Sequence, residues 1–318
     1  MGTGAIINQI IIAGIIIIVG VIGARVGVID KDARDRISKL VFNITLPLLI
    51  FSTFATMKLN SEIINNGFWV LIFSNITMFL AYIIGLLSVR LHRLNTPQIP
   101  IHILHTMFGN IVFLGFPLIK AIYPQQEGIL FASLFYFVSS YILWTFGVML
   151  LKNEKDTSWQ ERLKNLLNPN TIAFILGIGF MAININIPFV IIDPLKGIGS
   201  TTTYLALLYI GALLATTNLK GIYKRTDIYL LNFNKLLLVP LLILLIINVF
   251  ISFFNIHISD MAKTIIVLQA GMPCMSSIVI LAYVYGADDK AAAENLFVST
   301  ILSLATLPLL FTLSNTHF

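Results

Sequence analysis

The fold is decided by residues 108–117, which read Phe108-Gly109-Asn110-Ile111-Val112-Phe113-Leu114-Gly115-Phe116-Pro117. This segment places two glycines, an asparagine and a proline inside an apolar stretch that runs from 100 to 122. Proline removes a backbone donor and clashes with the preceding helical turn, while glycine leaves helical geometry at little cost. The segment therefore predicts a broken helix, with a simple proline kink as the alternative.

A second segment of the same kind lies at residues 269–277, which read Gln269-Ala270-Gly271-Met272-Pro273-Cys274-Met275-Ser276-Ser277. Kinks placed by chance need not recur with glycine and polar neighbours, so the pair favours two broken helices. Backbone groups freed in hydrocarbon are costly unless they line a protected, hydrated cavity. The half-helix N-termini would aim partial positive charge at a carboxylate, and the opposite ends would suit a cation.

The composition of the whole chain is that of a membrane protein. Of 318 residues, 58% are hydrophobic and 11% are charged, and the mean hydropathy is +0.92. Soluble proteins carry about a quarter charged residues. A cytosolic enzyme, a disordered chain and a nucleic-acid-binding domain are therefore excluded, despite the net charge of +6. A bilayer span needs roughly 20 apolar residues, so the chain has room for about ten.

The apolar blocks predict an all-α polytopic membrane protein with ten transmembrane helices. They lie at residues 5–24, 37–57, 67–89, 100–122, 127–151, 170–187, 196–217, 228–254, 259–284 and 291–313. The first block has its basic cluster after it and none before it, which indicates a retained anchor rather than a signal peptide. Sixteen of the twenty Lys and Arg residues fall in one set of alternate loops. This set, in which Lys235 is counted with the loop before the eighth span, marks the cytoplasm and places both termini outside.

The chain divides near its midpoint at its longest hydrophilic connection, with five predicted spans on either side. Because five is odd, related halves must enter the membrane from opposite sides, as in the inverted repeats of many secondary transporters. We therefore predict a first inverted repeat over 1–151, a cytoplasmic linker over 152–169 and a second repeat over 170–318. The two broken helices are the fourth span of each half.

Residues 109–117 resemble the GN-x-x-x-LG-x-P segment of the auxin efflux carrier family, the bacterial and plant transporters related to the plant PIN-formed proteins. Further stretches are similar to other family features. These are Asn43-Ile44-Thr45-Leu46-Pro47 in the second span, Asn168-Pro169-Asn170 at the opening of the second half, and Met272-Pro273 in the ninth span. The resemblance covers nearly the whole chain. It fails at Cys274 and Met275, where smaller residues are expected, and the large cytoplasmic loop of the long plant members is absent.

The resemblance implies a fold similar to that of the bile acid symporters and sodium/proton antiporters, with broken helices four and nine crossing at their prolines. It implies a secondary active or facilitative transporter of a small organic anion, a carboxylate such as malate, malonate or an auxin-like acid. The expected location is the bacterial cytoplasmic membrane. Spans three to five and eight to ten would form a crossing core that moves by alternating access, like an elevator, against a scaffold of spans one, two, six and seven.

Asn110 is the first candidate for substrate binding, because a side-chain amide donates to a carboxylate without burying a charge. Its alternative role is to satisfy the backbone freed by Pro117. On the facing helix the polar candidates have interhelical hydrogen bonding as their alternative. The candidate substrate-binding residues are Asn110, Gly109, Pro117, Gln269, Met272, Pro273, Ser276, Ser277, Asn43, Thr45 and Thr202. The last three belong to polar clusters in spans two and seven, which suggest cavity walls or hydroxyls bonded to their own helix.

Coupling groups are harder to find, because every acidic residue outside the loops lies near a predicted span end. A proton antiporter that depends on a buried pair of aspartates is therefore disfavoured. His105 and Glu294 are the candidates for coupling to protons or sodium, which leaves uniport as open as symport. For His105 the alternative is an interfacial histidine that touches headgroups, and for Glu294 it is a charge that complements a helix N-terminus.

The sequence carries no motif of an enzyme: it has no phosphate-binding glycine loop, Ser-His-Asp arrangement or zinc spacing. We expect no cofactor, no metal and no nucleic acid. The expected partners are the organic anion and the lipid bilayer, with a homodimer left open. An anion channel or a non-transporting membrane receptor for a carboxylate remains the competing class of function.

Overall fold

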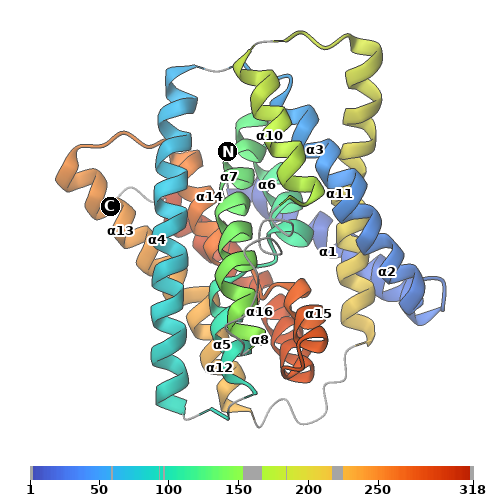
Figure 1. Ribbon diagram of the computed structural model, residues 1–318, viewed down its shortest axis with the longest axis vertical. Helices are drawn as coiled ribbons and strands as arrows, with labels where there is room; N and C mark the ends of the chain where they lie inside the picture. The colour runs from blue at the N-terminus through green and yellow to red at the C-terminus, as the bar shows by residue number, and fades with distance from the viewer. Residues whose placement is uncertain are drawn as a thin grey trace.

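The computed structural model describes residues 3–58, 60–92, 94–95, 97–152, 167–183, 185–216 and 225–315. Within these ranges the regular secondary structure is helical, apart from one pair of bridged residues, and turns and loops join the helices. Long helices such as α4 and α11 run close to the long axis of the molecule, and shorter helices are packed between them (Figure 1).

The described residues include six helical segments that are long and apolar enough to cross a membrane. They are Lys31–Phe54, Ser61–His92, Gln126–Leu151, Phe189–Ala215, Thr226–Phe254 and Asp289–Asn315. Shorter apolar helices lie at Ile11–Arg25, Ile111–Ile122 and Pro169–Ala182. The chain is a multi-pass membrane protein, as its composition predicts.

Helical segments overlap each of the ranges predicted for the first half. They are α1 (Thr3–Arg25), α2 (Lys31–Leu40), η1 (Val41–Thr45), α3 (Leu46–Phe54), α4 (Ser61–His92), α5 (Ile99–Met107), η2 (Ile111–Gly115), α6 (Phe116–Ile122), α7 (Gln126–Ile142), η3 (Leu143–Gly147) and α8 (Val148–Lys152). The segments named η are π-helical, and each continues directly into the α-helix that follows. Only α5 and η2 are parted by a non-helical segment within one predicted span.

The second half follows the same pattern. Its helices are α10 (Pro169–Ala182), α11 (Phe189–Thr216), α12 (Thr226–Phe233), η5 (Asn234–Leu238), α13 (Val239–Phe254), α14 (Asp260–Ala270), α15 (Ser276–Val284) and α16 (Asp289–Asn315). The Asn-Pro opening has a local cause, because the Asn168 side chain accepts hydrogen bonds from the backbone of Asn170 and Thr171, both at 3.1 Å. Most of the predicted linker, residues 152–169, lies outside the described residues.

Of the four π segments in the described part of the chain, three end two residues before a proline, at Pro47, Pro117 and Pro240. A proline ring clashes with the carbonyl four residues earlier, and in each case that carbonyl lies in the π segment, where the wider turn gives it room. The helix therefore continues through these prolines. This differs from the expectation that Pro117 ends a half-helix, because the chain leaves helical geometry at 108–110 instead.

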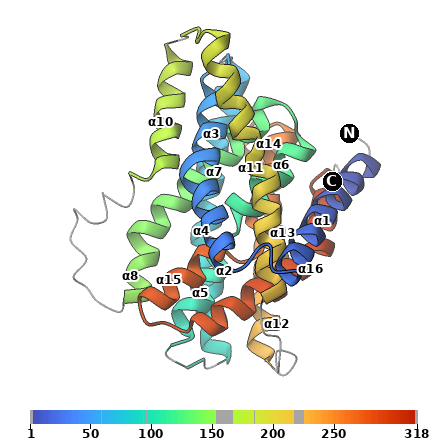
Figure 2. The ribbon, with the colours of Figure 1, turned by 90° about the vertical axis from the view of Figure 1, so that its right-hand side faces the viewer.

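The helices pack in two groups. Helices α1, α3, α10 and α11 contact one another extensively. A second set, α4, α5, α7, α13, α14 and α16, is packed in the same way. Figure 2 shows α3 and α10 toward one end of the molecule and α5 and α15 toward the other, with α11 running along most of its length. The broken helices of both halves belong to the second group and touch the first through η2, α6 and α11.

Candidate functional site

The two helix breaks meet and pair through their backbones. Gly109 and Cys274 form an antiparallel bridge. The N–H of Asn110 donates to the carbonyl of Pro273 at 2.7 Å, and the N–H of Met275 donates to the carbonyl of Phe108 at 3.2 Å. Backbone groups that each helix loses at its break are therefore satisfied by the other break, which makes the pair viable at membrane depth.

Two glycines of the 108–117 segment allow this close approach. A Cβ on Gly109 would lie 2.8 Å from the Cβ of Met272, and one on Gly115 would lie 2.5 Å from Oε1 of Gln269. Real Cβ atoms do not come so close to backbone or side-chain neighbours that are themselves packed. Gly109 therefore lets the breaks cross, and Gly115 makes room for the Gln269 amide.

Asn110 lies at the crossing in the conformation of an inverse γ-turn, with φ −77° and ψ 61°. Its side-chain oxygen accepts a hydrogen bond from the N–H of Phe113 at 3.3 Å and so caps η2. Its Nδ2 is buried and has no hydrogen-bond partner among the described residues. The oxygen thus serves the backbone, as one interpretation of the sequence held, while the nitrogen keeps two donors for another group.

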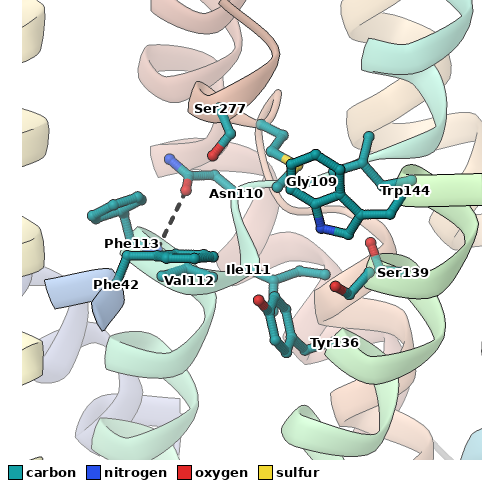
Figure 3. A pocket seen from close by; sticks show the side chains of 13 residues that line it. Phe42, Gly109, Asn110, Ile111, Val112, Phe113, Tyr136, Ser139, Trp144 and Ser277 are labelled. Atoms are coloured by element: carbon teal, nitrogen blue, oxygen red, sulfur yellow. Dashed lines mark hydrogen bonds between the residues drawn. The ribbon is translucent and has the colours of Figure 1, made fainter. Parts of the chain in front are cut away.

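A narrow cavity of about 40 Å³ adjoins Asn110. Figure 3 shows Ser277 beside the Asn110 amide, with Tyr136, Ser139 and Trp144 across the cavity. The lining residues are Phe42, Gly109, Asn110, Ile111, Val112, Phe113, Tyr136, Ser139, Ser140, Leu143, Trp144, Met275 and Ser277. An apolar lining with a few neutral donors can bind an apolar or aromatic body and orient its polar end.

The structure brings part of the predicted set together. Gly109, Asn110 and Ser277 line the cavity, and Pro273 accepts the hydrogen bond that ties the breaks. Other predicted residues lie nearby or in a different place. Met272 and Gln269 are buried against Gly109 and Gly115, Ser276 is buried in the first turn of α15, and Pro117 lines a separate cavity with Lys120 and Ser200.

The candidates from spans two and seven do not line the cavity. Asn43 is exposed, and its Nδ2 donates to the carbonyl of Lys39 in its own helix at 2.9 Å. Thr45 and Thr202 are buried, and neither hydroxyl has a partner in the part of the chain that the structure describes. The residue of span two that lines the cavity is Phe42. Asn43 and Thr45 are not among the lining residues.

The two coupling candidates have unlike surroundings. The Glu294 carboxylate accepts a hydrogen bond from Arg225 at 2.9 Å, and Arg225 also pairs with Asp227 at 2.6 Å. His105 is fully buried, and neither ring nitrogen has a partner within the described ranges. The interpretation of His105 as an interfacial residue is therefore wrong. Its neighbour one turn earlier, His102, is also buried and bonds Ser88 at 2.7 Å.

Sequence reasoning missed the polar face of α7 and η3. Tyr136, Ser139, Ser140 and Trp144 all line the cavity. Their spacing of three, four and eight residues places them on one helical face. This spacing of polar and aromatic residues within an apolar span could have indicated a cavity-lining face from the sequence.

Sequence reasoning also misplaced Lys235, which was counted in a loop. The side chain is 1% exposed, within η5, and its Nζ donates to the carbonyl of Met107 at 3.2 Å. The correction has a physical cause: a backbone carbonyl at the end of α5 supplies the partner that the sequence did not reveal. Its position inside the predicted span 228–254 was the warning sign.

In the described ranges no group of three or more His, Cys, Asp or Glu residues is placed to hold a metal ion. The polar groups at the crossing are amides, hydroxyls and backbone N–H groups. Such groups can donate hydrogen bonds to an anion or to a neutral polar group, whereas imidazole and thiolate are the usual ligands of transition metals.

The chain matches the membrane transport protein family over residues 5–162 and again over 158–311. An uncharacterized transporter of Methanocaldococcus jannaschii is 23% identical, covering 95% of this chain and 96% of its own length. An uncharacterized transporter of Methanothermobacter thermautotrophicus is 26% identical, covering 93% and 94%. The chain therefore belongs to this family, the auxin efflux carrier family that its 108–117 segment resembles.

Proposed function

We propose that this member of the auxin efflux carrier family is a carrier of a small organic anion, a carboxylate, that works by alternating access in the cytoplasmic membrane. The observation that carries the proposal is the Asn110 amide nitrogen, a buried donor without a partner among the described residues, beside a cavity at the crossing. Buried polar groups are nearly always paired, so an unpaired donor in a cavity is a reason to expect a ligand that accepts.

The N-terminus of α15 supports an anionic ligand. Its N-cap residue, Met275, lines the cavity and makes no capping hydrogen bond with its side chain. The first turn carries no acidic residue. The free N–H groups and the positive end of the helix dipole therefore face an uncapped position, which a carboxylate oxygen would fill.

The neutral chemistry of the site suits transport as well as binding. Asn110, Ser139, Ser277 and the N–H groups of α15 hold an anion without a permanent carboxylate or metal in the cavity. A site of this kind exchanges its ligand readily, because no strong ion pair must be broken for release. Phe42, Phe113 and Trp144 would contact the apolar body of the acid.

The arrangement of helices supports a ten-span, inverted-repeat carrier. Helical segments overlap all ten predicted ranges, and both breaks fall at the fourth position of their half. The packing into two groups corresponds to a scaffold of spans one, two, six and seven and a crossing core. On this proposal the core moves against the scaffold, and both termini lie outside the cytoplasm.

A thermal-shift screen of mono- and dicarboxylates, with and without sodium and across pH, tests the binding step. Counterflow in proteoliposomes with any acid that raises the melting temperature tests transport. Asn110→Ala should reduce uptake to the level of protein-free liposomes, because it removes the donor at the cavity. Asn43→Ala is the matched control, since that asparagine is exposed and bonds its own helix.

Each result has a distinct meaning. Saturable counterflow that Asn110→Ala abolishes and Asn43→Ala keeps supports a carrier with its site at the crossing. Single-channel currents would show a pore, and binding without flux would show a receptor. Unchanged counterflow in Asn110→Ala would remove the proposed site.

A further inference from the structure

The group that the proposed site does not use is Lys235, a buried lysine in the π segment η5. Its side chain is 1% exposed, and η5 packs against α4, α5 and α16. Lysine is almost never fully buried unless it is paired. Its presence in the middle of a helix packing group therefore requires a partner or a function.

The partner that the structure provides is a helix end. Nζ of Lys235 donates to the carbonyl of Met107, the last residue of α5, at 3.2 Å. The last carbonyls of a helix lack intrahelical donors and carry the negative end of the dipole. Lys235 thus occupies the place at a half-helix C-terminus that a bound cation would otherwise take.

No carboxylate neutralises this ammonium group within the residues that the structure describes. Two other cations that are buried or half-buried do have one: Lys263 pairs with Asp260 at 3.0 Å, and Arg225 pairs with Asp227 and Glu294. A half-charge at a helix end balances a full charge only in part. A negative charge is therefore missing from the surroundings of Lys235.

A negative charge could be bound close to Lys235, at the crossing of the two breaks. Met107 precedes Asn110 by three residues, so the carbonyl that binds Lys235 lies within about 10 Å of the Asn110 backbone along the chain. Phe108 and Gly109 lie between them in the chain, and Gly109 is bridged to Cys274. A carboxylate at the crossing would therefore feel the ammonium charge through low-dielectric protein rather than through water.

We propose that Lys235 is a resident counter-ion of the transport site: its ammonium group takes the place of a coupling cation at the end of α5 and balances one negative charge of the bound carboxylate. This inference rests on the proposed function. It identifies the substrate class as a monovalent organic anion and makes a bound sodium ion unnecessary. It also predicts which state of the carrier is charged.

The charge of each state follows by addition. The core loaded with a monovalent anion carries no net charge from the pair of Lys235 and ligand, whereas the empty core carries one positive charge. Exchange of anion for anion moves only loaded cores and should not respond to membrane potential. Net efflux requires the empty core to return and should respond.

The test compares exchange and net efflux of radiolabelled indole-3-acetate, a monovalent carboxylate at pH 7.5, in proteoliposomes with potentials set by potassium and valinomycin. Protein-free liposomes give the leak. Wild-type exchange should change by less than about twofold per 100 mV. One charge that crosses the whole field changes an equilibrium about 50-fold per 100 mV, and a rate by about sevenfold when the barrier lies midway. Lys235→Gln exchange should therefore change by about sevenfold, and Lys235→Arg should behave as wild type.

A lysine with a purely structural role would leave the voltage response of exchange unchanged in Lys235→Gln, and that outcome overturns the proposal. If Lys235→Gln does not fold, the wild type alone decides: flat exchange with steep net efflux supports a neutral loaded core, and steep exchange overturns it. If the wild type shows no flux above the leak, the proposed function itself has failed. This result is seen before any variant is made, and it also rejects the counter-ion role of Lys235.

Discussion

The two helix breaks pair with each other through the backbone and differ in the side chains at their cap positions. In the first, Asn110 caps the following helix and Lys235 holds the end of the preceding one. In the second, the cap position is Met275, and a Cβ on Gly271 at the end of α14 would meet Leu310 and Pro240. The first break thus supplies side-chain polarity, and the second supplies bare backbone N–H groups. On the proposed function a single anion would use both, so the paired breaks would form an asymmetric site.

The largest effect is expected from Gly109→Ala, which attacks what the two breaks share. The added Cβ would lie 2.8 Å from Cβ of Met272, so the crossing must open and both backbone hydrogen bonds must weaken. Overpacking costs about 1–3 kcal/mol. We expect a lower melting temperature and uptake at background. Gly179→Ala is the control, because nothing lies within 4 Å of that position, and equal behaviour of the two variants would contradict the close approach.

The next effect tests the difference between the breaks. Asn110→Asp keeps the oxygen that accepts from Phe113 but replaces the unpaired donor with a negatively charged acceptor. Loss of a hydrogen bond to a charged group costs about 1.5–3 kcal/mol, and repulsion adds to it. Uptake per folded protein should fall on the order of 100-fold. At the equivalent position Met275→Leu should retain uptake within about twofold.

The opposite result would contradict this difference between the two breaks. A Met275→Leu variant that loses uptake together with Asn110→Asp would mean that the second break contributes its side chain, not its backbone alone. The comparison is read from initial uptake rates normalised to the amount of folded protein in the vesicles.

A smaller effect is expected at Gln269, whose amide nitrogen and oxygen are both buried and unpaired in the described part of the chain. An unsatisfied buried group costs about 1–3 kcal/mol. Gln269→Leu should therefore raise the melting temperature while it lowers uptake on the order of tenfold. Gln126→Leu should do the opposite to stability, since Gln126 donates to Thr56 at 2.8 Å. A destabilised Gln269→Leu would show that the amide is satisfied in the membrane.

The smallest effect is expected at Glu294. Its carboxylate is bonded to Arg225 at 2.9 Å, and Glu294 does not line the cavity at the crossing. Glu294→Gln should leave uptake within about twofold at every sodium concentration and pH. Measurements of uptake with imposed sodium and proton gradients check this, and a gradient dependence that disappears in the variant would make Glu294 the coupling group.

The sequence located both breaks because glycine and proline act on the backbone directly. It misjudged which residue ends the helix, because Pro117 is accommodated by the preceding π segment. The spacing of apolar residues in the sequence does not indicate a helical turn that is one residue wider. The family prediction and the membrane class needed only composition and short motifs. The domain limits and the roles of the site residues stay predictions.

The remaining errors concern partners that lie far away in the sequence. Lys235 was read as a loop residue because charge usually marks a loop, and its acceptor, the Met107 carbonyl, lies 128 residues earlier. Asn43 looked like a cavity residue, but its amide bonds its own helix. The polar face of Tyr136 and Trp144 went unread because hydroxyls in apolar helices commonly bond their own backbone.

The bridge between Gly109 and Cys274 has a consequence for how such proteins diversify. The two hydrogen bonds that join the breaks run from backbone to backbone, so they do not depend on which side chains stand at positions 110 and 275. Substitutions at these two positions can change which ligand is bound, while the backbone hydrogen bonds between the breaks are kept. Single substitutions beside the bridge could therefore alter what the carrier binds, provided that position 109 remains glycine.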